Sequence, residues 1–418
     1  MQSTKAHNVS VLNKFEALLS YTNTLNLERS TENFLEVAAL LMKRPMLKIG
    51  DPGTNKSGSA KTIFSCFTDA KVKRIGLTAN STADQVFGGL IVEYYLQGKQ
   101  VFNLEEGAAN FEFVIFDEIF KVENADLLNK LLFFFDEESE IFQDGKMQKT
   151  KLEAAILTSN ELPLPGSHDA LMNRITIKAS VSRLQSGNNR KLMLSNKHKN
   201  ISAPKLVLND LYEARKEAVQ VTISDSILNL LICDEEYERL CGIAQAQDMT
   251  LPPLDQSRAL VDKLAVQGVK VSDRQIVQLF GQRTNAPSFL QAVAWLSGSH
   301  EVTEDHLVFL LNTLWSNEQE IPKIQEVLKT LDTTAQYSQK VQSLHETFTN
   351  FKNLADGTDR EKQIKRSAGL SQLGNISEAI NSLNALNSTS PKVLGLLAEL
   401  SSMRDTTELI VNSLGRTF

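Results

Sequence analysis

A glycine-rich loop between a short apolar run and a potential helix is the feature that most constrains the fold of this chain. The stretch "GDPGTNKS" begins at Gly50 and nearly matches the phosphate-binding pattern G-x-x-x-x-G-K-[ST]. Lys56 and Ser57 are in place, but Asn55 stands where the pattern has its second glycine. Because such a loop works between a strand and a helix, the sequence predicts a strand before Gly50 and a helix after Ser57.

The residue types in this loop suit phosphate chemistry. Backbone N–H groups of such a loop, and of the helix behind it, point at phosphate oxygens. Lys56 would reach the β- and γ-phosphates, and the Ser57 hydroxyl would ligate Mg²⁺. Gly53 would let the backbone turn, and Asn55 tolerates the left-handed conformation better than most non-glycine residues. The alternative is a plain loop of Gly, Pro and Ser residues with an exposed lysine.

A second motif follows about 60 residues downstream. The run "FEFVIFDE", residues 111–118, is typical of a buried parallel strand that ends in two acids. Asp117 can bind Mg²⁺ through water, and Glu118 can polarise an attacking water. The alternative is a strand that ends in a solvated acidic pair. The spacing fits a nucleoside-triphosphatase core, and the two motifs together favour that interpretation.

Further apolar patterns complete an α/β prediction. Residues 9–20 and 30–43 are expected to form amphipathic helices, the second with Ser30 as its N-cap. Downstream, the sequence predicts a helix, a hairpin turn and another buried strand, at residues 125–139, 144–145 and 154–160. Strands that alternate with helices indicate a parallel sheet with helices packed against it.

The carboxyl ends of these strands define a candidate site. Ligands bind at that edge of a parallel sheet, so Gly50, Asp117 and Asn160 are expected to lie together. Asn160 could position the nucleophilic water, although a strand-end asparagine is usually a turn residue. Arg174, in "ALMNRITIK", is a candidate arginine finger acting on a neighbouring subunit, although a lone arginine after a helix usually makes a surface salt bridge.

Composition sets the broad class. The 418 residues are 42% hydrophobic and 22% charged, as in ordinary globular proteins, and the net charge of -6 disfavours a general nucleic-acid binder. The three cysteines are scattered, which fits a reducing compartment. No signal peptide is predicted in "MQSTKAHNVS", and no apolar stretch reaches the roughly 18 residues needed to span a bilayer. A cytoplasmic location is the expectation.

The chain is expected to comprise four parts. Residues 1–183 would form the α/β nucleotide-binding core, and the polar stretch 184–204 a linker. Residues 205–320 carry helical patterns without a clear strand and would form an all-α lid. Residues 321–418 are helical and polar, and would form a helical C-terminal region that serves as an interaction module.

The motifs together resemble AAA+ ATPases of the MoxR group, most closely its RavA branch. "NLERSTENFLEVAALL" looks like the branch's helix entry, and "GDPGTNKS" is similar to its phosphate loop, which often lacks the last glycine. "FDEIFKVENADLLNKLL", "TSNELPLPGSHDALMNRITIK" and "VKVSDRQIVQ" are similar to three further segments of that branch. The resemblance covers about residues 10–320. It implies an AAA+ P-loop core with a parallel sheet flanked by helices, followed by an all-α lid.

The resemblance also implies roles for named residues. The nucleotide-binding residues would be Gly50, Asp51, Pro52, Gly53, Thr54, Asn55, Lys56, Ser57 and Asp117. Ser57 and Asp117 would hold Mg²⁺, Glu118 would activate water, and Asn160 would be the first sensor. Arg174 would be the arginine finger from a neighbouring subunit. Arg274 would be the second sensor, contacting the γ-phosphate from the lid; an exposed helix arginine is an equal interpretation.

The family implies ATP or ADP and Mg²⁺ as ligands, a homo-hexameric ring, and chaperone-like remodelling of an unidentified protein client. The leading hypothesis is therefore an Mg-dependent ATPase that remodels a protein partner. A nucleotide-gated structural ring with little hydrolysis is the alternative, motivated by Asn55. A nucleic-acid motor is a third hypothesis, which the net charge disfavours. One segment stays open: "STADQVFGGL" fits either a pore-facing loop or a plain helix cap and turn.

Overall fold

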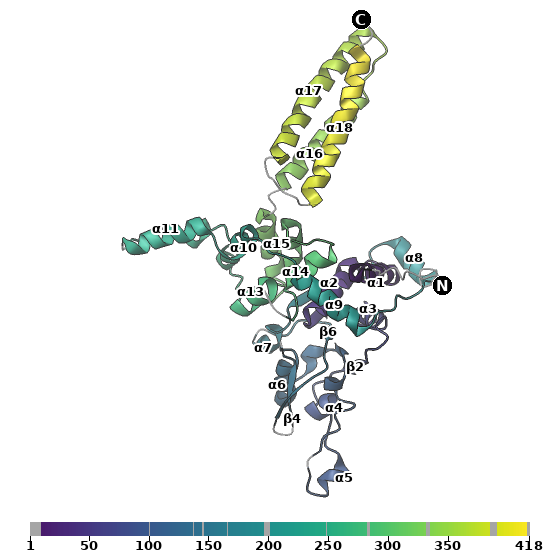
Figure 1. Ribbon diagram of the computed structural model, residues 1–418, viewed down its shortest axis with the longest axis vertical. Coiled ribbons are helices and arrows are strands. Elements are labelled where there is room, and N and C mark those ends of the chain that lie inside the picture. Colours follow the sequence, from purple (N-terminus) through teal and green to yellow (C-terminus); the bar gives the residue numbers. More distant parts are fainter. Residues whose placement is uncertain are drawn as a thin grey trace, which may run out of the picture. The chain divides into compact units, whose positions relative to one another are not determined.

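The structure is a computed structural model (Figure 1) that describes residues 10–99, 101–136, 138–143, 146–164, 166–195, 201–247, 249–281, 285–331, 335–384 and 391–415. The chain forms two compact units. The first runs to Val302 and also includes Phe309–Ile324. The second comprises Thr303–Val308 and the chain from Gln325 onward.

A five-stranded parallel sheet organises the first unit, in the order β2-β3-β6-β1-β7. Its strands are β1 Met46–Ile49, β2 Val72–Gly76, β3 Phe113–Asp117, β6 Ala154–Ser159 and β7 Ile177–Ser180. Every residue of β6 is buried, as are the first four of β3, which explains why both read as continuous apolar runs. The strands predicted before Gly50, before Glu118 and before Asn160 are confirmed.

Two strands of this sheet, β2 and β7, were not predicted. β2 lies at the edge of the sheet and carries Lys73 and Arg74. Exposed and half-buried residues alternate along this strand. β7 is buried at its first three residues but includes Lys178. Burial lowers the pKa of Lys178 to about 8, although the negative charge of Glu320 acts in the opposite sense. The Lys178 ammonium donates a hydrogen bond to the Thr313 carbonyl at 3.1 Å. Charged residues in both strands conceal the apolar signal.

Helices cover the sheet and lead into a short hairpin. The core helices are α1 Val11–Leu25, α2 Ser30–Met42, α3 Lys56–Phe64, α4 Ala83–Phe87, α5 Val92–Tyr95, α6 Ala125–Phe134 and α7 Asp169–Met172. β4 Glu140–Gln143 and β5 Lys146–Lys149 pair antiparallel, which confirms a hairpin there. The turn predicted at residues 144–145 lies outside the described residues.

The prediction of Ser30 as an N-cap is wrong. Ser30 is already the first residue of α2, and Arg29 takes the cap position without a side-chain cap bond. The backbone N–H of Asn33 donates to the Arg29 carbonyl, so the helical hydrogen bonds begin one residue earlier than predicted. The helix itself is confirmed and ends where Lys43 adopts a left-handed conformation.

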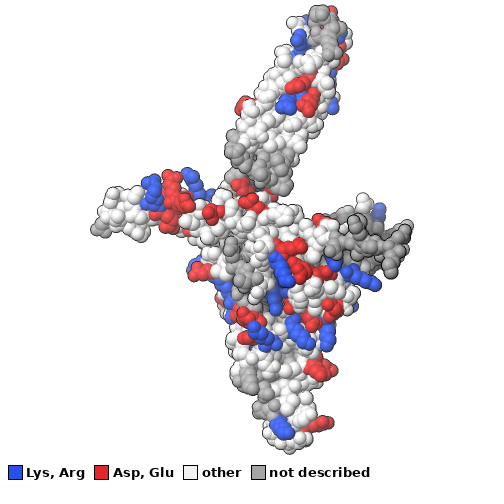
Figure 2. Space-filling view, in the orientation of Figure 1, with Lys and Arg blue, Asp and Glu red and all other residues white. Residues whose placement is uncertain are grey.

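The segment "STADQVFGGL", for which the sequence left two interpretations, forms a helix cap and turn. The Thr82 hydroxyl accepts from the Gln85 N–H, the Gln85 side chain accepts from the Thr82 N–H, and α4 follows. Gly88 ends this helix at φ 107°. Beyond it, α5 lies at the far end of an extension of the first unit (Figure 1). Its surroundings are mostly uncharged, whereas acidic and basic side chains are interspersed over the rest of that unit's visible face (Figure 2).

Helices dominate the rest of the first unit. They are α8 Gly187–Ser195, α9 Leu208–Val219, α10 Asp225–Ile232, α11 Glu235–Ala246, α12 Leu260–Val266, α13 Asp273–Phe280 and α14 Phe289–Leu296. Every residue of α14 is buried, and it packs against α1, α2, α9 and α13. α8 falls within residues 184–204, the stretch that was predicted to be a linker, so part of that stretch is helical.

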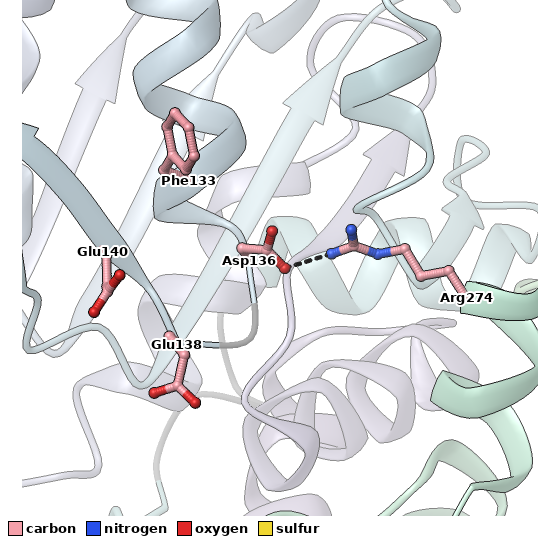
Figure 3. Close-up of a pocket in the computed structure, with 5 residues that line it drawn as sticks. All are labelled: Phe133, Asp136, Glu138, Glu140 and Arg274. Carbon is pink, nitrogen blue, oxygen red and sulfur yellow. Dashed lines mark hydrogen bonds and ion pairs between the residues drawn. The ribbon is translucent and has the colours of Figure 1, made fainter. Parts of the chain in front are cut away.

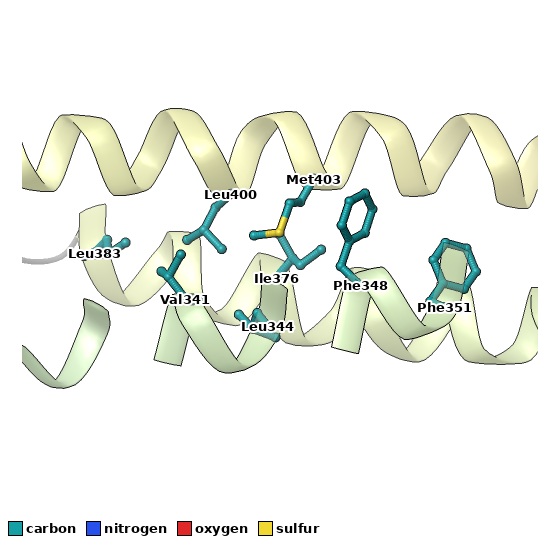
Figure 4. Packing of buried hydrophobic residues seen from close by; sticks show 9 residues of the cluster. Val341, Leu344, Phe348, Phe351, Ile376, Leu383, Leu400 and Met403 are labelled. Atoms are coloured by element: carbon teal, nitrogen blue, oxygen red, sulfur yellow. The ribbon is translucent and has the colours of Figure 1, made fainter. Parts of the chain in front are cut away.

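The second unit is a bundle built from α16 Ala335–Lys352, α17 Asp359–Asn384 and α18 Pro391–Gly415, preceded in the chain by α15 Glu320–Leu331. Its core residues interdigitate between the three bundle helices (Figure 4) and include Val341, Leu344, Phe348, Phe351, Ile376, Leu383, Leu400 and Met403. A Cβ on Gly369 would come within 2.4 Å of a Val411 methyl, so the helices approach closely there. The predicted helical C-terminal region is confirmed.

Within the described ranges, no helix is long and apolar enough to cross a membrane.

Candidate nucleotide-binding site

The loop after β1 has the backbone geometry of a phosphate-binding loop. A Cβ on Gly50 would lie 2.1 Å from the Val181 carbonyl oxygen, so only glycine fits the start of the loop. Asn55 adopts φ 64° and ψ 32° directly before Lys56, the first residue of α3. The left-handed turn therefore survives without the usual glycine, as the tolerance of asparagine for this conformation predicts.

Gly58 makes room for Asn55, a point that sequence reasoning missed. A Cβ at position 58 would lie 1.8 Å from Asn55 Oδ1, because the Asn55 side chain folds over the first turn of α3. The signal was available in the sequence as a glycine three residues after Asn55. A larger residue before the lysine is thus accommodated by a smaller one within the helix.

The Lys56 ammonium is directed into the loop. It donates to the carbonyls of Gly50 at 2.5 Å and Asp51 at 3.0 Å, and to Asn160 Oδ1 at 2.8 Å. Burial lowers the pKa of Lys56, and the carboxylates of Glu118, Asp51 and Asp117 act in the opposite sense. An ammonium has three donors, and here all three face oxygen atoms that phosphate oxygens could replace.

Asn160 links the lysine of the loop to the second acid of β3. Its Nδ2 donates to Glu118 Oε1 at 2.6 Å while its Oδ1 accepts from Lys56. Glu118 stands in a left-handed conformation at φ 60° just beyond β3, and its other oxygen lies 3.3 Å from the Lys121 ammonium. The carboxyl ends of β1, β3 and β6 thus meet in one hydrogen-bonded chain, as predicted from the strand pattern.

Ser57 and Asp117 meet beside this chain. The Ser57 hydroxyl donates to Asp117 Oδ1 at 2.6 Å, and the Thr158 hydroxyl donates to the same oxygen at 2.9 Å. Hydroxyl and carboxylate oxygens are donors that Mg²⁺ prefers, so the residues present fit that ion. No group of three or more His, Cys, Asp or Glu residues that could hold a metal occurs among the described residues. Mg²⁺ usually keeps several waters and binds substrate phosphates in addition to one or two protein ligands.

A buried ion pair lies behind the loop and was not predicted. Lys48 of β1 pairs with Glu36 of α2 and also donates to the Ser59 hydroxyl of α3. Lys48 is fully buried and Glu36 is 1% exposed. The sequence signal was a lysine inside an apolar strand and a glutamate inside an apolar helix. The pair ties the strand before the loop to α2, and the hydrogen bonds of Lys48 and Glu36 with Ser59 tie both to α3, the helix after the loop.

The two candidate arginines meet elsewhere, at Asp136. Arg274 of α13 donates to Asp136 Oδ1 at 2.6 Å, beside a pocket that Phe133, Glu138 and Glu140 also line (Figure 3). Arg174 lies 3.8 Å from Asp136 Oδ2. Burial lowers the pKa of Arg174, and the positive charge of Arg274 acts in the same sense.

Arg174 is also tied to the backbone of its own chain. It donates to the Leu132 carbonyl at 2.9 Å and to the Ala170 carbonyl at 3.0 Å, which joins the end of α6 to α7. Of the predicted site residues, the structure joins Lys56, Asn160 and Glu118 in one hydrogen-bonded chain. Ser57 and Asp117 form a second hydrogen-bonded contact beside that chain. Arg174 and Arg274 lie near each other because both contact Asp136.

The conformation of Asn55 leads to a first prediction. Asn55→Val is expected to weaken ATP binding about 5- to 30-fold, because a β-branched residue in the left-handed region costs about 1–2 kcal/mol and would pull the loop out of shape. Asn55→Gly should bind as wild type does. Equilibrium titration with a fluorescent ATP analogue measures both. Equal binding by the valine variant would contradict the role given to this conformation.

The chain is similar to known proteins over most of its length. Residues 15–212 match the family model described as the MoxR domain in the MoxR-vWA-beta-propeller ternary systems. One uncharacterized protein of Methanocaldococcus jannaschii is 22% identical over 333 residues, which is 79% of this chain and 77% of that protein. A second from the same organism is 23% identical over 324 residues, 75% of each chain.

A solved structure shares the fold. The crystal structure of a protein from Cytophaga hutchinsonii, described as a candidate ATPase, superposes with a TM-score of 0.54 at 18% identity. The match covers 77% of this chain and 94% of that one. The predicted fold class, an α/β AAA+ core with a parallel sheet flanked by helices, is confirmed, and residues 15–212 are similar to a MoxR domain.

Proposed function

We propose that this chain is an Mg-dependent ATPase that binds ATP at the loop between β1 and α3 and hydrolyses it with Glu118. The single observation that carries the proposal is the hydrogen-bonded chain from Lys56 through Asn160 to Glu118. It joins a phosphate-binding cation to a carboxylate at the strand edge where ligands of parallel sheets bind. The match of residues 15–212 to a MoxR domain supports the same conclusion.

The chain's own residues supply the parts of phosphoryl transfer. Backbone N–H groups at the start of α3 lack helical partners and face the loop, so they can bind phosphate oxygens. Ser57 and Asp117 would hold Mg²⁺, which when bound neutralises charge on the phosphates. Thr158 orients Asp117, because its hydroxyl donates a hydrogen bond to the same carboxylate oxygen that accepts one from Ser57.

Glu118 and Asn160 would act on the water. Glu118 orients it for in-line attack and draws its proton, and Asn160 holds the carboxylate in place. When Lys56 turns from Asn160 Oδ1 to a phosphate oxygen, that amide oxygen is released. It can then accept a hydrogen bond from the attacking water, so the Asn160 side chain becomes available to the water only when a phosphate is bound.

We further propose a homo-hexameric ring with ATP bound at subunit interfaces, in which Arg174 of the neighbouring subunit stabilises the transition state. Arg274 would act as the second sensor, and motion of the lid (residues 205–320) against the core would remodel a protein client, with residues 321–418 as an interaction module. The matched family is named for ternary systems with vWA and β-propeller partners, which supports a protein client. The RavA branch and a cytoplasmic location stay predictions.

A second candidate function is a nucleotide-gated ring with little hydrolysis. It is favoured by Asn55, which replaces a glycine of the usual loop, and by the bundle of α16, α17 and α18, which could serve as a docking surface. In that case ATP would bind and promote assembly without turnover. Measuring nucleotide binding and phosphate release on the same preparation separates the two functions.

Nucleotide binding itself is tested at Lys56. Lys56→Ala is expected to weaken ATP binding about 10- to 150-fold, because a hydrogen bond to a charged group contributes about 1.5–3 kcal/mol. Lys61→Ala is the matched control, since Lys61 is an exposed lysine of the same helix. Titration with a fluorescent ATP analogue in Mg²⁺ measures both. If Lys56→Ala binds as tightly as Lys61→Ala, the loop is not the nucleotide site and the proposal fails.

A further inference from the structure

Arg74 of the edge strand β2 reaches both side chains that would hold Mg²⁺. Its Nε donates to Asp117 Oδ2 at 2.5 Å, and its Nη2 lies 3.4 Å from Ser57 Oγ. One guanidinium therefore bridges the hydroxyl and the carboxylate of the metal site. Neither sequence motif nor spacing pointed to this residue, because it lies in a strand that the sequence did not reveal.

The strand register explains the reach of this side chain. Gly76 of β2 stands opposite Asp117 of β3, so Arg74 starts two residues earlier and on the same face. A long side chain is needed to cover that distance along the sheet. Lys73 points to the opposite face, where it donates to the Glu106 carbonyl and lies 5.1 Å from the Phe111 ring centre.

These contacts engage both carboxylate oxygens of Asp117. Its Oδ1 accepts from Ser57 and Thr158, and its Oδ2 accepts from Arg74. A dication that approaches Ser57 and Asp117 meets a positive charge already in place. Two cations this close repel each other, so the guanidinium has to leave the carboxylate as the metal arrives.

We propose that Arg74 is the counter-ion of Asp117 when no metal is bound, and that it competes with Mg²⁺ for this carboxylate. It is a positioning residue: it sets the Mg²⁺ concentration at which the nucleotide is held, and it stabilises Asp117 while no metal is bound. This inference rests on the proposed function, because it concerns the metal that accompanies ATP.

The exposure of the pair limits the size of the effect. The Arg74 side chain is 62% exposed and that of Asp117 is 18% exposed. Exposed ion pairs are worth little, so removal of the guanidinium should lower the half-saturating Mg²⁺ concentration about two- to five-fold. The same competition should weaken at high salt, which screens the pair.

The test is Mg²⁺ titration of the full chain with a fluorescent ADP analogue, which requires no turnover. Arg74→Gln removes the charge and Arg74→Lys keeps it, while Lys73→Gln removes one charge from the same strand on the opposite face. We expect a lower half-saturating Mg²⁺ concentration for Arg74→Gln alone. Arg74→Lys and Lys73→Gln should stay at the wild-type value, and all four proteins should bind the analogue at saturating Mg²⁺.

The possible results are distinguishable. An unchanged or higher Mg²⁺ requirement in Arg74→Gln, with intact binding of the analogue at saturating Mg²⁺, overturns the inference and leaves the proposed function standing. An equal shift in Lys73→Gln also overturns it, because the effect would then follow net charge and not position. If the wild type binds no nucleotide at any Mg²⁺ concentration, the proposed function fails and the inference fails with it.

Discussion

Replacing Glu118 with glutamine is expected to lower steady-state ATP turnover about 10²- to 10⁴-fold, the range for loss of a positioned general base. Glutamine keeps the shape and can still contact Asn160, but it cannot take a proton from water. ATP binding should change by no more than about two-fold, because the interaction matters in the transition state. Phosphate release at saturating Mg-ATP and a parallel binding titration measure the two quantities.

The matched control is Glu123→Gln, which neutralises an exposed carboxylate a few residues further along the chain. It should keep wild-type turnover. A Glu118→Gln variant that turns over as fast as Glu123→Gln would mean that Glu118 is a solvated strand-end acid. A variant that loses both turnover and binding would point to damage of the loop through Asn160 instead.

The second large effect is expected at Arg174. Arg174→Ala should lower turnover about 10³- to 10⁵-fold if the residue acts as an arginine finger. The structure also gives it a local role, because it donates to backbone carbonyls at Leu132 and Ala170. Loss of activity alone therefore cannot separate a finger from a structural tie between α6 and α7.

Mixing two inactive variants separates these roles. Subunits with Arg174→Ala keep Glu118, and subunits with Glu118→Gln keep Arg174. In a mixed ring, an intact site on one subunit faces an intact arginine on its neighbour, so phosphate release should reappear on mixing. If the Arg174→Ala variant unfolds at the same temperature as the wild type, its fold has survived the substitution. If that variant is folded and the mixture stays inactive, Arg174 does not act on a neighbouring subunit.

The phosphate loop and its sheet edge could be predicted because local chemistry determines them. A glycine at position 50, a lysine at 56 and polar residues after buried strands are readable from the chain. Parallel strands gather such residues at one edge. The structure links Lys56, Asn160 and Glu118 by hydrogen bonds there, and Ser57 to Asp117.

Long-range pairings could not be predicted from the sequence. β2 and β7 contain Arg74 and Lys178, whose hydrogen-bond partners, Asp117 and the Thr313 carbonyl, lie far along the chain. The same holds for Lys48, which Glu36 neutralises inside the core. The meeting of Arg174 and Arg274 at Asp136 depends on how α13 packs near the end of α6, which no local pattern records.

The most direct test of the central claim is steady-state phosphate release by the purified wild-type protein with ATP, with and without Mg²⁺. Lys56→Ala and Glu118→Gln serve as blanks. The account predicts Mg-dependent release by the wild type and none above background by either variant. Wild-type release no greater than that of Glu118→Gln, in a protein that still binds ATP, would contradict the hydrolytic function and leave the nucleotide-gated ring.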